Sequence, residues 1–197
     1  ADAGPTPVPA TAATPAMRAR GRARSVKHGM ADRISFMQAE ATATGLPAGE
    51  ADFVWGEDAW CYVCDKDALI AEAARLIRKN GAIAFTDWVE GRVSMSETET
   101  QRFMRFMKFP TLARIDDYRY LIEKNNCKIV QSEDTCRFAP YVDLYLEMLD
   151  KQFTYDALEI IGFDVELMKA IREELLFMQK LAHEGKIIQG IFVGHKM

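Results

Sequence analysis

The alternation of apolar and polar positions predicts strands and helices in turn along most of the chain. Short apolar runs bounded by turn residues are typical of buried strands, and apolar residues at i, i+3 and i+4 are typical of helices. The predicted strands are Ile34–Gln38, Asp52–Trp55, Ala82–Thr86, Cys127–Gln131 and Ile187–His195. Strands that alternate with helices indicate an α/β fold whose mostly parallel sheet is covered by helices on both faces.

Helix boundaries are marked by capping residues. A helical pattern runs from the cap Asp65 to about Asn80, and a capping box at Ser96 opens a second helix that ends before Pro110. Further helices are predicted over Tyr118–Asn125, Tyr141–Gln152 and Asp164–His183. The last two separate the final pair of strands, so we expect a helical insertion over about residues 141–183 that forms a lid or an extra layer.

The composition indicates one main domain and argues against two classes of partner. The chain has 197 residues, of which 49% are hydrophobic, and its net charge is −4. Residues 1–30 hold five cations and one anion, so the rest of the chain is acidic and unsuited to nucleic acid. No apolar run approaches the roughly 20 residues that cross a bilayer. We therefore expect no nucleic-acid partner, no membrane partner and a cytoplasmic location.

The four cysteines are interpreted as reduced thiols, since no secretory signal is evident. Cys61 and Cys64 have the spacing of redox and zinc motifs, but Cys127 and Cys136 lie too far apart to complete a zinc knuckle. Ordinary packing is therefore favoured and no metal site is predicted. A thiol-dependent redox role for Cys61 and Cys64 stays open.

Residues 1–24 differ from everything that follows them. They are rich in Ala, Thr and Pro, end in alternating Arg, and carry almost no large apolar side chains. Such a composition favours disorder, because little apolar surface is available to offset the entropy of ordering. We therefore expect a disordered leader over residues 1–24 and a folded domain over residues 25–197.

Polar and aromatic residues follow two neighbouring strands of the predicted sheet. Asp58 comes after the strand Asp52–Trp55, and Asp87-Trp88 end the strand that begins at Ala82. The carboxyl ends of parallel strands meet at one edge of an open α/β sheet, where ligand crevices are found. The pattern therefore predicts a small-molecule enzyme.

Five short motifs occur in a fixed order over this same region. Each is weak alone, and their order and spacing together are more specific. They are Glu40-Ala41, Leu46-Pro47, Asp52-Phe53-Val54-Trp55, Asp58-Ala59-Trp60-Cys61-Tyr62 and Ile77-Arg78-Lys79-Asn80-Gly81. In this order the chain, from about Ser25 to Met197, resembles the class I S-adenosylmethionine-dependent methyltransferases. It resembles most the branch of the sarcosine/dimethylglycine and phosphoethanolamine N-methyltransferases.

The resemblance implies a Rossmann-like sheet, mostly parallel with an antiparallel C-terminal strand, and S-adenosylmethionine as cofactor. It assigns cofactor binding to Ala39, Glu40, Ala41 and Glu57. The Glu40 carboxylate would accept a hydrogen bond from the adenine amine, and the Ala41 N–H would meet a ring nitrogen. Taken without the family, Glu40 is better interpreted as a solvated surface residue in a turn.

The resemblance also implies a small amine as methyl acceptor. Asp58 would face the amine, and Tyr62 takes the place of a histidine of the family; both are candidate catalytic residues. A phenol with a pKa of about 10 is a poor base at neutral pH. Trp60, Tyr62 and Trp88 would form a partial aromatic cage for a methylated ammonium group. The alternatives are a capping or ion-pairing Asp58 and tryptophans that pack under the lid.

The chain departs from the family at its start. The family begins with a strand and a glycine-rich turn that admits the cofactor, and a second strand that ends in an acid. Neither is found, as though the first βαβ unit were lost. The missing strands would lie between Ile34–Gln38 and Asp52–Trp55, so two edges would stay unpaired. A truncated, weakly active chain, folded by re-pairing or by a partner such as a second copy, is therefore expected.

Two functions of different classes remain. The first is an S-adenosylmethionine-dependent methyltransferase that acts on a small amine. The second is a non-catalytic remnant that serves as a dimerisation or regulatory module. A cofactor-binding assay distinguishes this module from the methyltransferase.

Overall fold

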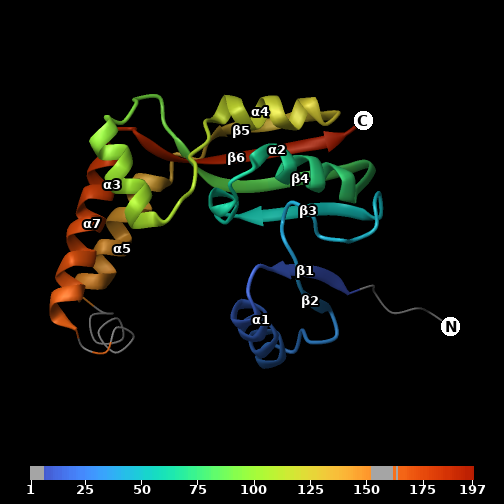
Figure 1. The fold of residues 1–197 in the computed structure, drawn as a ribbon, viewed down its shortest axis with the longest axis horizontal. Helices are drawn as coiled ribbons and strands as arrows, with labels where there is room; N and C mark the ends of the chain where they lie inside the picture. The colour runs from blue at the N-terminus through green and yellow to red at the C-terminus, as the bar shows by residue number, and fades with distance from the viewer. Residues whose placement is uncertain (1–6, 152–161, 163) are drawn as a thin grey trace.

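A computed structural model describes residues 7–151, 162 and 164–197 (Figure 1). Its strands are β1 (Val8–Ala12), β2 (Ile34–Gln38), β3 (Ala51–Glu57), β4 (Ile77–Glu90), β5 (Cys127–Asp134) and β6 (Ile187–Lys196). Its helices are α1 (Pro15–Lys27), α2 (Lys66–Leu76), α3 (Glu97–Met107), α4 (Ile115–Lys124), α5 (Phe138–Lys151) and α7 (Val165–His183). A short 3₁₀ helix, η1 (Trp60–Tyr62), follows β3.

The strands form two sheets. β1 pairs in parallel with β2, and the larger sheet has the order β3-β4-β6-β5. β3 and β4 are parallel, whereas β6 is antiparallel to both of its neighbours. β3, β4 and β5 therefore run in one direction, and the C-terminal strand β6 runs against them, as the sequence predicts.

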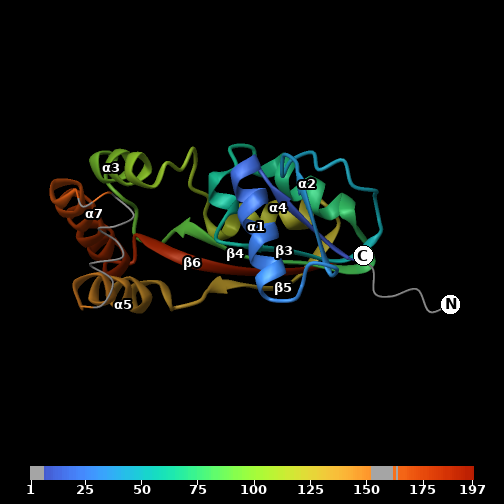
Figure 2. The ribbon, with the colours of Figure 1, turned by 90° about the horizontal axis from the view of Figure 1, so that it is seen from below.

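The carboxyl ends of β3 and β4 point toward a separate group of helices. Figure 1 shows α3, α5 and α7 gathered beyond this end of the sheet, and Figure 2 shows the same grouping from below. α5 packs against α7, and both contact β6. These two helices correspond to the predicted insertion, although α5 begins at Phe138, three residues before the predicted Tyr141. The end predicted for this helix, Gln152, lies outside the described residues.

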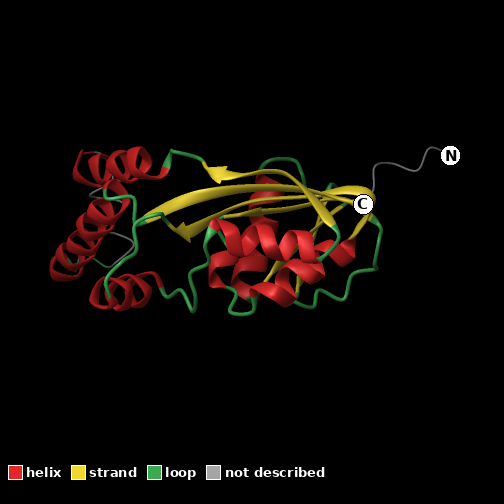
Figure 3. Cartoon of the chain, turned by 90° about the horizontal axis from the view of Figure 1, so that it is seen from above, coloured by secondary structure: helices red, strands yellow, loops and turns green. Residues whose placement is uncertain are grey.

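The core of the larger sheet lies between the strands and two helices. α2 and α4 contact each other and pack on the same face of the sheet (Figure 3). The fully buried side chains there include Ile70, Ile83, Phe85, Tyr118 and Phe192. The prediction that helices cover both faces is therefore wrong for this sheet, because its two crossover helices lie side by side on one face.

β3 is an edge strand, which contradicts its prediction as a buried strand. Phe53 is 50% exposed and Trp55 is 56% exposed, while Val54 points the other way and packs against the core. β4 covers only one side of β3, so residues that alternate along it are divided between the core and solvent.

The helix that Asp65 caps ends earlier than predicted. The Asp65 side chain accepts a hydrogen bond from the N–H of Ala68, and the helix continues only to Leu76. Ile77 is already extended and pairs with Ala51 of β3. Residues 77–80, which have a helical pattern in the sequence, are therefore extended because pairing with β3 outweighs their local helix propensity.

Residues 7–24 carry secondary structure, which corrects the predicted leader for this part of the chain. The Thr14 side chain accepts a hydrogen bond from Met17 N–H, and Pro15 opens α1 at a position that needs no N–H donor. At Gly21 an added Cβ would lie 2.5 Å from the Phe36 ring, so α1 rests directly on β2. Contact with β2 thus orders a segment that has few large apolar side chains.

No helix of the described residues is long and apolar enough to cross a membrane.

Candidate functional site

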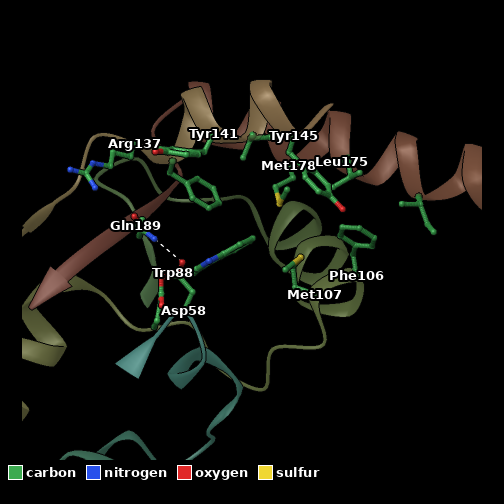
Figure 4. Close-up of a pocket in the computed structure, with 14 residues that line it drawn as sticks. Asp58, Trp88, Phe106, Met107, Arg137, Tyr141, Tyr145, Leu175, Met178 and Gln189 are labelled. Atoms are coloured by element: carbon green, nitrogen blue, oxygen red, sulfur yellow. Dashed lines mark hydrogen bonds between the residues drawn. The ribbon is translucent and has the colours of Figure 1, made fainter. Parts of the chain in front are cut away.

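A cavity of about 660 Å³ lies beyond the carboxyl ends of β3 and β4. Glu57 lines it from the end of β3, Asp58 from the residue after that strand, Trp88 from β4 and Gln189 from β6. α3, α5 and α7 supply the remaining walls, including Phe106, Met107, Tyr141, Tyr145, Leu175 and Met178 (Figure 4). We call this space the Asp58 cavity; its walls are largely apolar, and its polar groups gather where the strands end.

Asp58 is held by hydrogen bonds on its backbone and on one carboxylate oxygen. Its N–H donates to the carbonyl of Thr86 at 2.9 Å, and its φ of 45° is a left-handed conformation that Asp tolerates better than most residues. Its Oδ2 accepts a hydrogen bond from Gln189 Nε2 at 2.7 Å (Figure 4). Its Oδ1 is buried with no hydrogen-bond partner. A buried bare carboxylate oxygen in a cavity is a site for a donor from a ligand.

The β4–β6 ladder brings Gln189 to this carboxylate. Trp88 and Gln189 are opposite each other in the ladder. Thr135 Oγ1 donates to Gln189 Oε1 at 3.0 Å, which leaves the Gln189 amide nitrogen to donate to Asp58. The orientation of the Asp58 carboxylate is thus fixed by a chain of two side-chain hydrogen bonds.

Trp88 forms one wall together with two phenylalanines. Its ring meets Phe138 edge-on with centroids 4.7 Å apart and Phe109 edge-on at 5.6 Å. Edge-to-face contacts of this kind fix the plane of a ring. Trp88 is therefore positioned before any ligand arrives.

Asp87 fixes the turn that connects Asp58 to α2. Its carboxylate is fully buried and accepts hydrogen bonds from Tyr118 OH at 2.6 Å and from Cys61 N–H at 2.9 Å. Burial raises the pKa of Asp87, while these two donors act in the opposite direction. Burial and the Asp87 charge also raise the pKa of Tyr118 far above its ordinary value. The pair is a structural anchor for η1.

Lys66 holds the same turn from its other side. Its ammonium donates to the carbonyls of Trp60 at 2.8 Å and Cys61 at 3.3 Å, and to that of Val63. Burial lowers the pKa of Lys66, although the nearby Asp87 charge opposes this effect. Asp87 accepts a hydrogen bond from the Cys61 N–H, and Lys66 donates to carbonyls of the same turn. These contacts together restrict the movement of η1.

The predicted aromatic cage is not assembled. Trp60 is 8% exposed and stacks on Phe85, with ring centroids 4.1 Å apart, inside the core. Tyr62 is 54% exposed and packs against Phe109, outside the residues that line the Asp58 cavity. Burial raises the pKa of Tyr62, which makes it a still poorer base. Of the predicted substrate-binding residues, Asp58 and Trp88 come together.

The four predicted cofactor residues are divided between different surroundings. Glu57 lines the Asp58 cavity. Ala41 lines a second cavity of about 580 Å³ between β1 and β3, which we call the β1–β3 groove; Trp60 lies there too. The Ala39 N–H donates to the Ala12 carbonyl, and Glu40 forms a bridge with Ala43. Neither Ala39 nor Glu40 lines either cavity.

The sequence pattern missed four polar wall residues, which are Gln189, Arg137, Tyr141 and Tyr145. Gln189 is a lone amide in the apolar run of β6, a signal that a site lies beside this strand. Arg137 and Tyr141 are exposed on the turn before α5 and on α5 itself. Nothing in the local sequence relates these two residues to Asp58, because the helical insertion is brought to the cavity only by tertiary packing.

Among the described residues the thiols are not part of a cluster that could hold a metal ion. All four cysteines are free, and no group of three or more His, Cys, Asp or Glu side chains in that part of the chain is placed to hold a metal ion. Burial, with the Asp87 charge, raises the pKa of Cys61 well above that of a free thiol. A thiol of this kind is a weak nucleophile, which argues against redox chemistry.

Comparison with known proteins identifies the fold. A family model described as "Methyltransferase domain" matches residues 3–85. Methyltransferase GfsG of Streptomyces halstedii is 30% identical over 119 residues, which cover 59% of this chain and 42% of that protein. The chain therefore spans less than half the length of this curated relative.

Solved structures agree with this assignment. A putative sarcosine dimethylglycine methyltransferase from Galdieria sulphuraria matches with a TM-score of 0.85 at 17% identity, over 96% of this chain and 69% of that one. Phosphoethanolamine N-methyltransferase 2 of Haemonchus contortus, solved with phosphomonomethylethanolamine and S-adenosylhomocysteine, matches with a TM-score of 0.83 at 16% identity, over 96% of this chain and 43% of that one. The predicted resemblance and fold class are thereby confirmed.

Proposed function

We propose that this chain, which has the fold of the class I S-adenosylmethionine-dependent methyltransferases, belongs to an enzyme that methylates a small molecule bound in the Asp58 cavity. The observation that carries the proposal is the buried, unpartnered Oδ1 of Asp58 at the carboxyl ends of β3 and β4. An oxygen in this state is costly unless a ligand donates a hydrogen bond to it.

The acceptor that fits this cavity is a small amine. An amine or ammonium N–H would donate to Asp58 Oδ1, while Gln189 keeps the other carboxylate oxygen in place. The face of Trp88 would favour a methylated ammonium group, because ring quadrupoles attract cations. Similar proteins of known structure include enzymes named for sarcosine, dimethylglycine and phosphoethanolamine, which supports this class of acceptor.

S-adenosylmethionine is the cofactor that the fold implies, and when bound it supplies the methyl group. The residues fit it in part. Glu57 stands next to Asp58 in the cavity, where a carboxylate suits the positive charge of this cofactor. Ala39, Glu40 and Ala41 would hold the adenine, but they do not share this cavity. The described residues thus provide one end of a cofactor site.

The chain's own contribution to methyl transfer is positioning and exclusion of water. The Asp58 carboxylate would accept a hydrogen bond from the N–H of the methyl acceptor and so aim its nitrogen lone pair. Gln189 holds this carboxylate, and the Thr86 carbonyl holds the backbone N–H of Asp58. The apolar walls from α3, α5 and α7 remove water from the amine. A neutral amine is already nucleophilic, so orientation contributes more than a general base.

A direct test measures cofactor binding and methyl transfer together. Isothermal titration with S-adenosylmethionine reports binding, and radiolabelled methyl transfer is assayed against sarcosine, dimethylglycine and phosphoethanolamine. We expect transfer to at least one amine and its loss in Asp58→Asn, with Asp32→Asn, an exposed aspartate outside the cavity, as the matched control. Equal activity in both variants would show that Asp58 does not hold the acceptor.

The non-catalytic module remains the second candidate because β1 and β3 are both edge strands. The same titration separates the two functions. Absence of binding at millimolar cofactor, with the chain folded, would favour the module.

A further inference from the structure

The Asp58 cavity has a charged end and an apolar end. The charged residues that line it in the described part of the chain are Glu57, Asp58 and Arg137. Figure 4 shows Asp58 and Arg137 on one side of the cavity, and Phe106 and Met107 of α3 on the other. Because the two carboxylates outnumber the single guanidinium, the charged end favours a cationic group.

The apolar end lies between helices and has no charged side chain among the described residues. Phe106 and Met107 line it from α3, and Ile171, Leu175 and Met178 line it from α7. The three α7 residues follow the spacing i, i+4 and i+7, so they form one stripe along this helix. Methionine adapts to apolar ligands of irregular shape, because its thioether chain is flexible and polarisable. This end of the cavity therefore fits an apolar group.

Two tyrosines of α5 line the cavity but are exposed to solvent. Tyr141 and Tyr145 are one helical turn apart, whereas their neighbour Val142 is buried in the core. An exposed ring on the wall of a cavity is apolar surface that a ligand can cover. The wall that α5 provides thus also lacks an apolar partner.

The three helices around the apolar end are connected to one another by ion pairs. Arg172 donates from Nε and Nη2 to the two carboxylate oxygens of Asp150, each at 2.9 Å, which connects α7 to α5. Arg102 Nε donates to Glu174 at 2.9 Å, which connects α3 to α7. The Arg102 guanidinium also lies 4.1 Å from the centroid of the Phe177 ring. The apolar end is therefore present before a ligand binds, as in most small-molecule sites.

The volume of the cavity exceeds what a short amine needs. About 660 Å³ is in the range of pockets that enclose drug-sized ligands. Sarcosine, dimethylglycine and phosphoethanolamine are far smaller, and each carries an acidic group opposite its amine. With its nitrogen at Asp58, each of these would leave the apolar end to water, which apolar walls hold poorly.

We propose that the acceptor is an amphipathic amine, whose nitrogen lies at Asp58 and whose apolar chain fills the space between α3, α5 and α7. This inference rests on the proposed function, because Asp58 is taken as the partner of the acceptor amine. It adds the group attached to the nitrogen, which is an alkyl or arylalkyl chain without a second charge. Burial of the chain supplies the affinity, and the bare Asp58 Oδ1 selects the atom that is methylated.

Isothermal titration of the full chain with a series of primary amines tests the apolar end. Butylamine, hexylamine and octylamine have the same head group and differ only in chain length. We expect the Kd to fall about fourfold for each added methylene that is buried. The α,ω-diamine with the chain length of octylamine would place a second ammonium group between the helices. It should therefore bind at least about 100-fold more weakly than octylamine.

Two variants separate the ends of the cavity. Asp58→Asn should weaken the binding of all three amines by the same factor, because their head groups are identical. α7 leads into β6, so Ile171, one turn before Leu175, lies farther from the strand ends, and Ile171→Trp shortens the apolar end. This variant should bind butylamine within about twofold of wild type and octylamine about tenfold more weakly. Leu176→Trp changes an exposed α7 residue outside the cavity and is the matched control, for which neither Kd should change.

The results distinguish this inference from the proposed function. Methyl transfer to sarcosine together with a Kd that is independent of chain length would keep the proposed function and overturn the amphipathic acceptor. The expected dependence on chain length without methyl transfer to any amine would support the amphipathic ligand and overturn its use as acceptor.

The controls show where the chain of the amine lies. Equal binding of octylamine and the diamine, or equal losses in Ile171→Trp and Leu176→Trp, would place the chain outside the apolar end and overturn the proposal. If Ile171→Trp loses butylamine as well, the substitution has disrupted the cavity as a whole, and the comparison of octylamine with the diamine in the wild-type chain decides.

Discussion

The Asp58 cavity and the β1–β3 groove are similar in volume but lack different partners. In the first, one side-chain oxygen is left without a hydrogen bond while the surrounding backbone is paired. In the second, two runs of backbone at sheet edges face each other across apolar side chains. A single bare carboxylate oxygen suits a small donor molecule, whereas the edge of a sheet needs a cover or a pairing partner.

Both cavities depend on one buried anchor, and removing it should have the largest effect. Asp87→Ala leaves the Tyr118 hydroxyl and the Cys61 N–H buried without an acceptor. We expect a loss of about 4 kcal/mol in the free energy of unfolding, at roughly 2 kcal/mol for each orphaned donor. Urea denaturation measures it, with Asp32→Ala as control. A loss below about 1 kcal/mol would mean that η1 is held mainly by Lys66.

The next effect concerns the Asp58 cavity alone. Asp58→Asn replaces the charged acceptor of this cavity by a neutral amide, and we expect kcat/KM for the amine to fall about 100-fold, since hydrogen bonds to charged groups are the strong ones. Radiolabelled methyl transfer measures this loss, and Asp32→Asn should leave kcat/KM unchanged. Equal losses in the two variants would exclude Asp58 as the partner of the amine.

A smaller effect concerns the loop that borders the groove. The Glu72 carboxylate accepts hydrogen bonds from Arg75 and from Thr44 N–H, and these contacts hold its pKa at about 2, below its ordinary 4.5. A lowered carboxyl pKa stabilises the fold above pH 4.5, and this contribution is lost as the pH falls toward about 2.

Glu72→Gln should therefore cost about 2 kcal/mol at neutral pH, and the difference from wild type should shrink below pH 4.5. Urea unfolding at a series of pH values measures this, with the exposed Glu123→Gln as control. A difference that stays constant down to pH 3 would exclude the Glu72 charge as its cause.

The smallest effect concerns the edge strand that borders the groove. Trp55 is exposed on β3 and lines the β1–β3 groove, so Trp55→Ala should change the free energy of unfolding by less than about 0.5 kcal/mol. Thermal unfolding of the chain measures this change. A loss above about 2 kcal/mol would mean that the Trp55 ring is packed against other side chains.

The sequence predicted those features that depend on local chemistry. Ser96 and Glu99 form the capping box of α3, and Asp65 caps α2 through its side chain. Asp58 and Trp88 lie in one cavity because both are at the carboxyl ends of neighbouring parallel strands, and strand polarity can be inferred from the alternation of strands and helices.

The sequence could not predict features that depend on packing between distant segments. α1 is ordered by its contact with Phe36, and its own composition gives no sign of that contact. Gln189 reaches Asp58 only through the register of β6 against β4. Trp60 and Tyr62, two residues apart in η1, diverge because one ring enters the core and the other meets Phe109.

The place of β6 also bears on the order in which the sheet can form. β6 follows β3, β4 and β5 in the sequence, yet it lies between β4 and β5 and brings Gln189 to the Asp58 carboxylate. β4 and β5 are therefore joined only after a segment that is synthesised later has inserted between them. A chain cut before Ile187 would lack Gln189, so its Asp58 carboxylate would lose the donor that orients it.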